Sequence, residues 1–216
     1  MMKSIFFGIV TLMFAVIVVH QESVFAERIT PTQNEWRFVS SKCFKDLHKQ
    51  INKEFNAAIF YLQYAAYFAQ EKVNLPGFEK FFFNAAAEER QHGMMLLEYA
   101  LMRGQDEVAE GTFKLDFDNI TAPVIPRNNF GAEDALKAAL KKEQEVTQSI
   151  RELIKTCEQT EGENGNEYHL VDYLTGEFLE EQHKGQRDLA GKIAMLKKML
   201  NTNPHLGEFI FDKQNM

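Results

Sequence analysis

Four long segments have apolar residues three or four positions apart, and this pattern constrains the fold more than any other feature of the chain. The segments cover about residues 43–70, 77–102, 132–158 and 168–200. Residues at this spacing share one face of an α-helix, where they can pack against neighbouring helices. At 1.5 Å per residue, each helix would be about 40 to 50 Å long. The sequence therefore predicts four long amphipathic helices.

The connections between these segments predict how the helices are arranged. Asn74–Gly77 and residues 161–166 are short breaks rich in turn-forming residues. Residues 104–131 form a much longer connection than the roughly 2 to 8 residues usual between bundle helices. Residues 206–213 can form a short fifth helix. This order of short, long and short connections predicts an all-α, up-down-down-up four-helix bundle with one long crossover loop.

Composition excludes several other classes of protein. The chain has 216 residues, which suits one domain plus a targeting segment. Its 5 Pro and 12 Gly are too few for a turn-rich all-β chain or a disordered one. The net charge of −7 disfavours a nucleic-acid partner and favours cations. Two Cys are too few for a disulfide scaffold or for a zinc site made of four thiolates.

The N-terminus has the pattern of a secretory signal peptide. Lys3 precedes the apolar run Ile5–Val19, which is shorter than the roughly 20 residues of a membrane span, and Ala26 ends a Val-Phe-Ala cleavage sequence. An uncleaved anchor is the alternative, which the lack of a following basic cluster disfavours. We therefore expect a signal peptide over residues 1–26, an N-terminal extension over 27–40 and the folded domain over 41–216.

Entry into the secretory pathway has consequences for the mature chain. We expect it to be secreted or to remain in the lumen, with no membrane contact after cleavage of the signal. Asn119 begins an Asn-Ile-Thr sequence and becomes an N-glycosylation acceptor, which the sequence alone leaves as used or unused. The two cysteines, Cys43 and Cys157, meet an oxidising compartment.

Each predicted helix carries polar residues on its apolar face near mid-length. Glu54 follows the apolar Ile51 by three positions, and Glu89 precedes His92 by the same interval. On the other two helices a carboxylate and an amide fall between apolar residues of the stripe. The inward polar set is Glu54, Tyr61, Glu89, His92, Glu143 and Gln182.

This set predicts a metal site. Burying carboxylates without partners is costly, and a multivalent cation makes such a cluster stable. Oxygen ligands with one imidazole suit iron or manganese better than structural zinc. Each residue alone has a simpler explanation, such as a salt-bridged Glu or a buried core His. Their coincidence on four facing stripes, with the Glu-x-x-His spacing of Glu89 and His92, instead predicts a di-metal site of the kind built in helix bundles.

The last helix offers two alternatives for this site. Glu180 and His183 have the spacing of a second Glu-x-x-His pair. Gln182, however, shares a face with Phe178 and Leu189, whereas Glu180 shares one with charged residues. We therefore predict that Gln182 lies in the site and that Glu180 lies in solvent.

Six groups of residues carry a family resemblance in combination. They are Ile51–Glu54 with Tyr61, Ala87–His92, Glu143–Ser149, His169–Leu174, Leu179–Gln182 and Gly207–Lys213. In these residues, and over about residues 41–213, the chain resembles the ferritins, closely so their secreted insect heavy-chain type. The resemblance implies a ferritin-like bundle that stores and detoxifies iron.

The resemblance also implies a ferroxidase centre. Glu54, Glu89 and His92 match the ligands of one iron, and Glu89 matches the bridging carboxylate. Glu143 matches a ligand of the second iron, with Gln182 beside it. The implied reaction is oxidation of paired Fe(II) by O2, followed by deposition of ferric oxide. Because the ligand set is intact, the resemblance implies a catalytic subunit and not the light type.

Further matched positions concern assembly and iron transport. Tyr61 matches a tyrosine that hydrogen-bonds near the site, and Glu88 matches one residue of a mineral-nucleating cluster. Asp172 matches one of two acids in an entry channel, but Thr175 stands at the second acidic position. The family implies a 24-subunit shell, either a homo-24-mer or a hetero-24-mer with light-type subunits.

Two questions stay open at this point. In the predicted bundle Cys43 and Cys157 lie at the same end, where they form either an intrachain disulfide or two free thiols. The rival functions are a helical cytokine-like ligand, which needs two long crossovers, a structural shell subunit with a vestigial site, and a di-iron oxygenase with a second Glu-x-x-His pair. The intact inward set favours the ferroxidase over all three.

Overall fold

Amphipathic periodicity produces long helices in the computed structural model, which describes residues 41–103, 123–126, 130–159 and 167–216. These residues belong to one compact unit. All the regular elements in these ranges are helices: α2 (Ser41–Phe68), α3 (Pro76–Met102), α5 (Ala132–Glu158), α6 (Tyr168–Tyr173), the π-helix η1 (Leu174–Leu179), α7 (Glu180–Thr202) and α8 (Pro204–Asn215). None of the described helices is long and apolar enough to cross a membrane.

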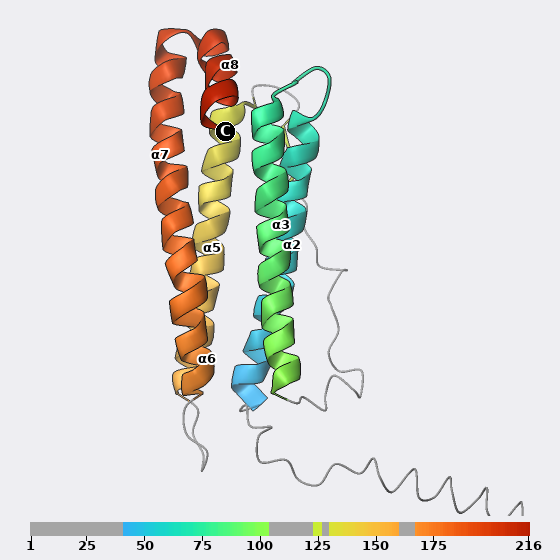
Figure 1. The fold of residues 1–216 in the computed structure, drawn as a ribbon, viewed down its shortest axis with the longest axis vertical. Helices are drawn as coiled ribbons and strands as arrows, with labels where there is room; N and C mark the ends of the chain where they lie inside the picture. The colour runs from blue at the N-terminus through green and yellow to red at the C-terminus, as the bar shows by residue number, and fades with distance from the viewer. Residues whose placement is uncertain (1–40, 104–122, 127–129, 160–166) are drawn as a thin grey trace, which may run out of the picture. The chain divides into compact units, whose positions relative to one another are not determined.

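The helices run up, down, down and up, as the connection lengths predict (Figure 1). α2 rises and α3 returns beside it, and these two helices share the most extensive interface. α5 also runs down, and α7 rises beside it. One long segment joins the lower end of α3 to the upper end of α5. The all-α bundle with a single crossover is confirmed. The predicted signal peptide, the extension over 27–40 and Asn119 lie outside the described residues.

The fourth and fifth helices differ in detail from the prediction. The fourth was expected to be one continuous helix over 168–200, but it contains the π-helical segment η1. Leu170, Leu174 and Phe178 are all buried at intervals of four residues. A spacing of four residues rotates side chains in one sense in an α-helix, and the wider turns of the π-helix offset that rotation, so the three residues stay on one face. The fifth helix, α8, extends beyond the expected 206–213 at both ends.

The helix α8 closes the upper end of the bundle by capping two other helices. Neither α3 nor α5 has a hydrogen-bonded side-chain cap of its own at the N-cap position. Asp212 Oδ1 accepts a hydrogen bond from the backbone N–H of Phe78 at 2.9 Å, and Glu208 Oε1 accepts one from Ala132 at 3.0 Å. Gly77 permits this contact, because a Cβ there would lie 2.1 Å from the Asp212 carbonyl oxygen. The C-terminal helix therefore stabilises the starts of two helices.

The core has an aromatic half and a half tied by a disulfide. Phe68 stacks on Phe78 and Phe82 with centroids 5.1 and 5.6 Å apart, within the range of favourable aromatic pairs. At the opposite end of the bundle Cys43 and Cys157 are joined by a disulfide. The structure therefore decides between the two alternatives for the cysteines, and the interior between these ends holds the polar cluster described next.

Candidate metal centre

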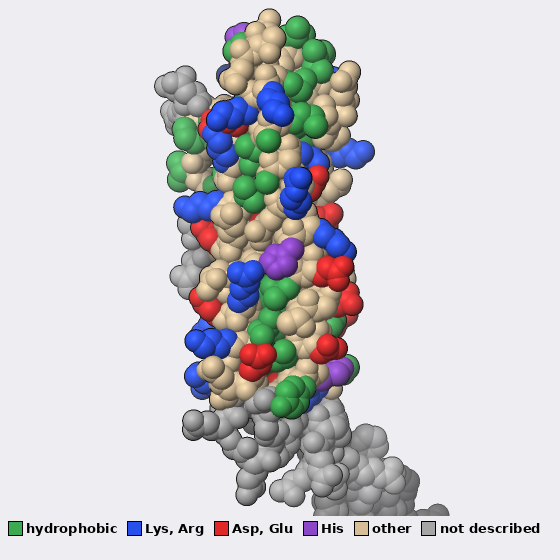
Figure 2. Space-filling view, turned by 90° about the vertical axis from the view of Figure 1, so that its left-hand side faces the viewer, with side chains coloured by type: hydrophobic (Ala, Val, Ile, Leu, Met, Phe, Trp, Pro, Cys, Tyr) green, Lys and Arg blue, Asp and Glu red, His purple; other side chains and the backbone are tan. Residues whose placement is uncertain are grey.

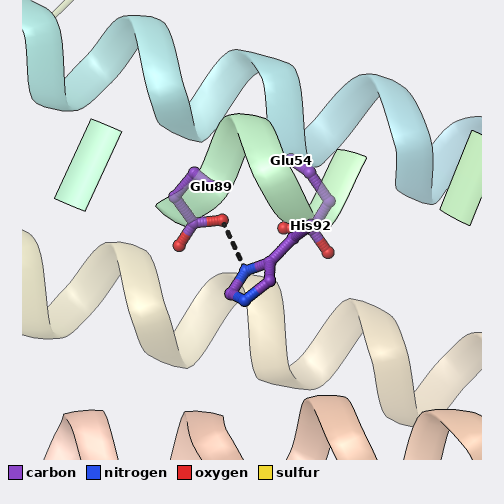
Figure 3. A group of neighbouring side chains, drawn as sticks. All are labelled: Glu54, Glu89 and His92. Atoms are coloured by element: carbon purple, nitrogen blue, oxygen red, sulfur yellow. Dashed lines mark ion pairs between the residues drawn. The ribbon is translucent and has the colours of Figure 1, made fainter. Parts of the chain in front are cut away.

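Three predicted ligands meet near the middle of the bundle. Glu54 projects from α2, and Glu89 and His92 project from consecutive turns of α3 (Figure 3). One ligand atom of each lies within 4.8 Å of the others, and all three residues are buried. This separation is slightly wider than the span of a single ion with ligands about 2.1 Å away, so small rotations of the carboxylates close the cluster around an ion.

The ligand atoms of this cluster lack the partners that buried polar groups normally have. Glu54 Oε2, Glu89 Oε2 and His92 Nδ1 are buried and make no hydrogen bond. His92 Nδ1 lies 3.6 Å from Glu89 Oε2, which is too far for a hydrogen bond. Unpaired buried oxygens are costly, and three such atoms converging on one point fit a bound cation.

Electrostatics in the metal-free protein point the same way. Burial, followed by the charge of Glu89, raises the pKa of Glu54 well above its usual value. Burial, followed by the charge of Glu143, likewise raises the pKa of Glu89. Both carboxyls therefore resist ionisation until positive charge is supplied. A divalent cation supplies that charge.

The second half of the centre lies beside a cavity of about 230 Å³. Tyr61, Glu89, His92, Glu143 and Gln182 all line it. The Tyr61 hydroxyl donates a short hydrogen bond to Glu143 Oε1 and holds that half-buried carboxylate on the site side of α5. The structure therefore brings together all six residues of the inward set.

Hydrogen bonds from neighbouring helices hold these side chains in place. Gln50 Nε2 donates to Glu54 Oε1 at 2.7 Å, and Ser149 Oγ donates a short bond to Gln50. The Thr147 hydroxyl donates to Gln182 Oε1 at 2.8 Å. Sequence reasoning gave no role to Gln50, Ser149 or Thr147. The only signal was that Gln50 lies one helical turn before Glu54, on the same face.

Glu181 is a further residue that the sequence analysis missed. Its Oε2 lies 3.2 Å from His92 Nε2. A metal-binding histidine commonly donates its other ring N–H to a carboxylate, which fixes the tautomer. With the proton of the neutral imidazole on Nε2, the lone pair of Nδ1 is directed at the two buried carboxylates. Glu181 therefore orients the His92 ring with Nδ1 towards the two buried carboxyls.

The alternative pair on α7 lies outside the centre. Glu180 and His183 are exposed, and Glu180 pairs with Lys184 through a hydrogen bond that lowers the pKa of the Glu180 carboxyl. Figure 2 looks onto the side of the bundle that α7 forms and shows acidic and basic side chains mixed along it. Gln182 is buried and Glu180 is in solvent, as the spacing predicts, and the place of Gln182 in the metal site stays a prediction.

The remaining predicted positions are not part of the buried Glu54, Glu89 and His92 cluster. Glu88 lines the same cavity as Glu181, and partial burial with the charge of Glu181 raises its pKa. Asp172 is exposed on α6. The Thr175 hydroxyl donates to the backbone oxygens of Val171 and Asp172 at 2.9 and 3.0 Å. It therefore satisfies its own helix and does not replace the expected acid.

The bundle and its buried Glu-Glu-His cluster can now be compared with known proteins. The model of the ferritin-like domain family matches residues 44–199. The chain belongs to the ferritin family. It is 56% identical to a ferritin heavy chain of Aedes aegypti over the full length of both chains, and 50% identical to that of Drosophila melanogaster over 83% of each. The crystal structure of Trichoplusia ni secreted ferritin matches with a TM-score of 0.71 and 46% identity, covering 86% of this chain and 95% of that one.

The family match covers the part of the chain that forms the buried cluster. The family match spans all four long helices, so each side chain of the centre falls inside it. The disulfide that joins α2 to α5 is compatible with the oxidising compartments through which secreted proteins pass. The family and the cluster together identify iron as the relevant ion.

Proposed function

We propose that this protein stores iron by oxidising Fe(II) with O2 at the buried centre, as a ferroxidase. The observation that carries the proposal is the convergence of three buried ligand atoms without hydrogen-bond partners, from Glu54, Glu89 and His92. Two Fe(II) ions give two electrons to one O2, which with two protons yields two Fe(III) and one hydrogen peroxide. Hydrolysis of the Fe(III) product then gives the stored ferric oxide.

The two iron positions have different surroundings. Glu54, Glu89 and His92 would hold one ion, and Glu89 would bridge to a second ion held by Glu143. Carboxylates are hard, anionic ligands that stabilise Fe(III) relative to Fe(II), so the site favours oxidation. Gln182, the buried polar side chain that α7 contributes to the cavity, would offer the second ion a neutral amide. Weaker binding there lets the oxidised product leave towards the cavity walled by Glu88 and Glu181.

We further propose that the subunits assemble as a 24-subunit shell, mixed with light-type subunits. The acidic surface expected of a nucleating cluster is thin along α3 near Glu88, since Asn84, Ala87 and Gln91 stand there. A light-type partner would supply the missing carboxylates. Cleavage after Ala26, glycosylation at Asn119 and entry of iron past Asp172 belong to the same proposal. The disulfide and the likeness to a secreted ferritin support a secretory route.

The test compares two double variants with matched chemistry. Glu54→Ala/His92→Ala removes two ligands, whereas Glu180→Ala/His183→Ala removes an exposed Glu and an exposed His at the native Glu-x-x-His spacing. Aerobic Fe(II) oxidation is followed by the absorbance of the ferric product, and shell assembly is checked by size-exclusion chromatography. We expect fast oxidation in the wild type and the control, and loss of the fast phase in the first variant. Equal rates in all three assembled proteins would contradict the proposal.

A further inference from the structure

A row of aromatic rings joins the iron centre to the lower end of the bundle. The ring of His92 lies 5.5 Å from that of Phe178, and Phe178 lies 5.4 Å from Tyr173, measured between centroids. Tyr173 stacks on Tyr99 at 5.5 Å with an angle of 13° between the ring planes. The row starts at a metal ligand and ends at a buried phenol near the end of α3, at the level of α6 (Figure 1).

The last phenol of the row has a proton acceptor in place. Arg103 Nη1 donates a hydrogen bond to the Tyr99 oxygen at 3.0 Å, and His169 Nδ1 lies 3.0 Å from the same oxygen. Because an arginine can only donate, the hydroxyl proton of Tyr99 is directed at His169 Nδ1, which accepts it in the neutral tautomer protonated on Nε2. His169 is exposed, whereas Tyr99 is buried. The proton therefore has a route to solvent.

This arrangement matters because a phenol gives up an electron easily only when its proton leaves at the same time. Burial raises the pKa of Tyr99, so the phenol stays protonated near neutral pH. Its electron and its proton have separate exits. The electron can pass inward along the row of rings, and the proton passes outward to the exposed imidazole of His169.

We propose that Tyr99 is a one-electron donor to the iron centre, connected to His92 through Tyr173 and Phe178, with His169 as the acceptor of its proton. The proposal rests on the iron oxidation proposed above. Hydrogen peroxide from one turnover can meet a single Fe(II), giving Fe(III), hydroxide and a hydroxyl radical. That radical takes the electron of Tyr99 and a proton from solvent and becomes water. Tyr99, having passed its proton to His169, becomes a neutral phenoxyl radical.

Fe(II), the substrate of the proposed oxidation, returns Tyr99 to its starting state. A further Fe(II) reduces the phenoxyl radical, which takes up a proton and returns to the phenol, while the iron becomes Fe(III). Every electron then comes from Fe(II), and the hydroxyl radical is consumed before it attacks the ligands of the centre. The row would thus protect the buried Glu-Glu-His cluster when iron arrives one ion at a time.

The test is detection of the phenoxyl radical by freeze-quench electron paramagnetic resonance. Assembled protein is loaded anaerobically with about one Fe(II) per subunit, mixed with hydrogen peroxide and frozen. Tyr99→Phe keeps the ring stack and removes the hydroxyl. Tyr67→Phe is the matched control, because Tyr67 is a half-buried phenol bonded to the Phe130 carbonyl oxygen in the other half of the core. We expect the tyrosyl signal in the wild type and in Tyr67→Phe, and its loss in Tyr99→Phe.

Two further variants separate a relay from a merely structural contact. Tyr173→Leu interrupts the ring row and should abolish the signal while Tyr99 and its hydrogen bonds remain. His169→Gln removes the proton acceptor of Tyr99 and should lower the signal. A signal that survives Tyr99→Phe, or that is absent from a wild type that oxidises Fe(II), would overturn the relay. The rate of Fe(II) oxidation by O2 is measured in parallel. If Tyr99→Phe oxidises Fe(II) as fast as the wild type, the iron centre is intact. The relay can then fail while the proposed ferroxidase function stands.

Discussion

Binding of a divalent ion to the metal-free protein should release protons from the buried carboxyls. Glu54 and Glu89 each face the charge of another carboxylate inside the bundle, and burial raises the pKa of both well above the usual value. The pair therefore retains protons at a pH where an exposed glutamate is already ionised. Metal ligands must be deprotonated to bind, so an incoming ion displaces the protons that the Glu54 and Glu89 carboxyls hold. The redox-inert ion Zn²⁺ isolates this step from oxidation.

The magnitude follows from the number of titrating groups. Two carboxyls limit the release to about two protons per ion, and each proton makes the apparent affinity rise about tenfold per pH unit, or about 1.4 kcal/mol. The affinity should rise with pH up to the raised pKa of the pair and level off above it. The free energy of unfolding of the protein without metal depends on pH in the opposite direction. The folded state holds a proton that the unfolded chain releases above about pH 4.5, so stability falls as the pH rises from there through the raised pKa.

Calorimetric titration with Zn²⁺ in buffers of different ionisation enthalpy measures the protons released per ion. Glu54→Gln removes one titrating carboxyl of the cluster, and Glu180→Gln removes an exposed one that belongs to a surface ion pair. We expect smaller proton release in the first variant and wild-type release in the second. Zero release by the wild type at a pH where exposed glutamates are ionised, or equal release in all three proteins, would refute the electrostatic reasoning.

Four other variants test neighbouring contacts. Glu181→Gln should weaken metal binding about 10- to 100-fold by loosening the His92 tautomer, measured by the same titration. Gln182→Glu should tighten the second iron position and slow product release, and unchanged iron turnover and binding would count against this role. Asp212→Ala should cost about 1 kcal/mol and speed amide exchange at the start of α3. Replacing both bridged cysteines by Ala should lower the thermal midpoint of unfolding. The disulfide closes a loop spanning 114 positions, and the entropy that it removes from the unfolded chain corresponds to about 4.8 kcal/mol at 25 °C.

The sequence predicts the parts of this structure that follow from a single helical period. Glu89 and His92 lie three positions apart, and any regular helix places such a pair on one face. The helical period alone does not predict the disulfide. The predicted topology brings both cysteines to one end of the bundle but does not fix the distance between them. The cap that Asp212 provides for Phe78 joins residues 134 positions apart, and no local pattern signals it. Contacts of this last kind depend on the packing of α8, which the residue spacing does not encode.

The fourth helix shows how a local departure from that period completes the centre. In an α-helix each step of four residues rotates a side chain by about 40°, so two steps from Leu174 would turn Gln182 well away from the core. The π-helical segment Leu174–Leu179 has wider turns and cancels this rotation. Gln182 consequently reaches Thr147, and Glu181 reaches the imidazole of His92. The spacing argument that predicted an inward Gln182 holds because the helix widens. The same widening places the exposed Glu181 within reach of the His92 ring.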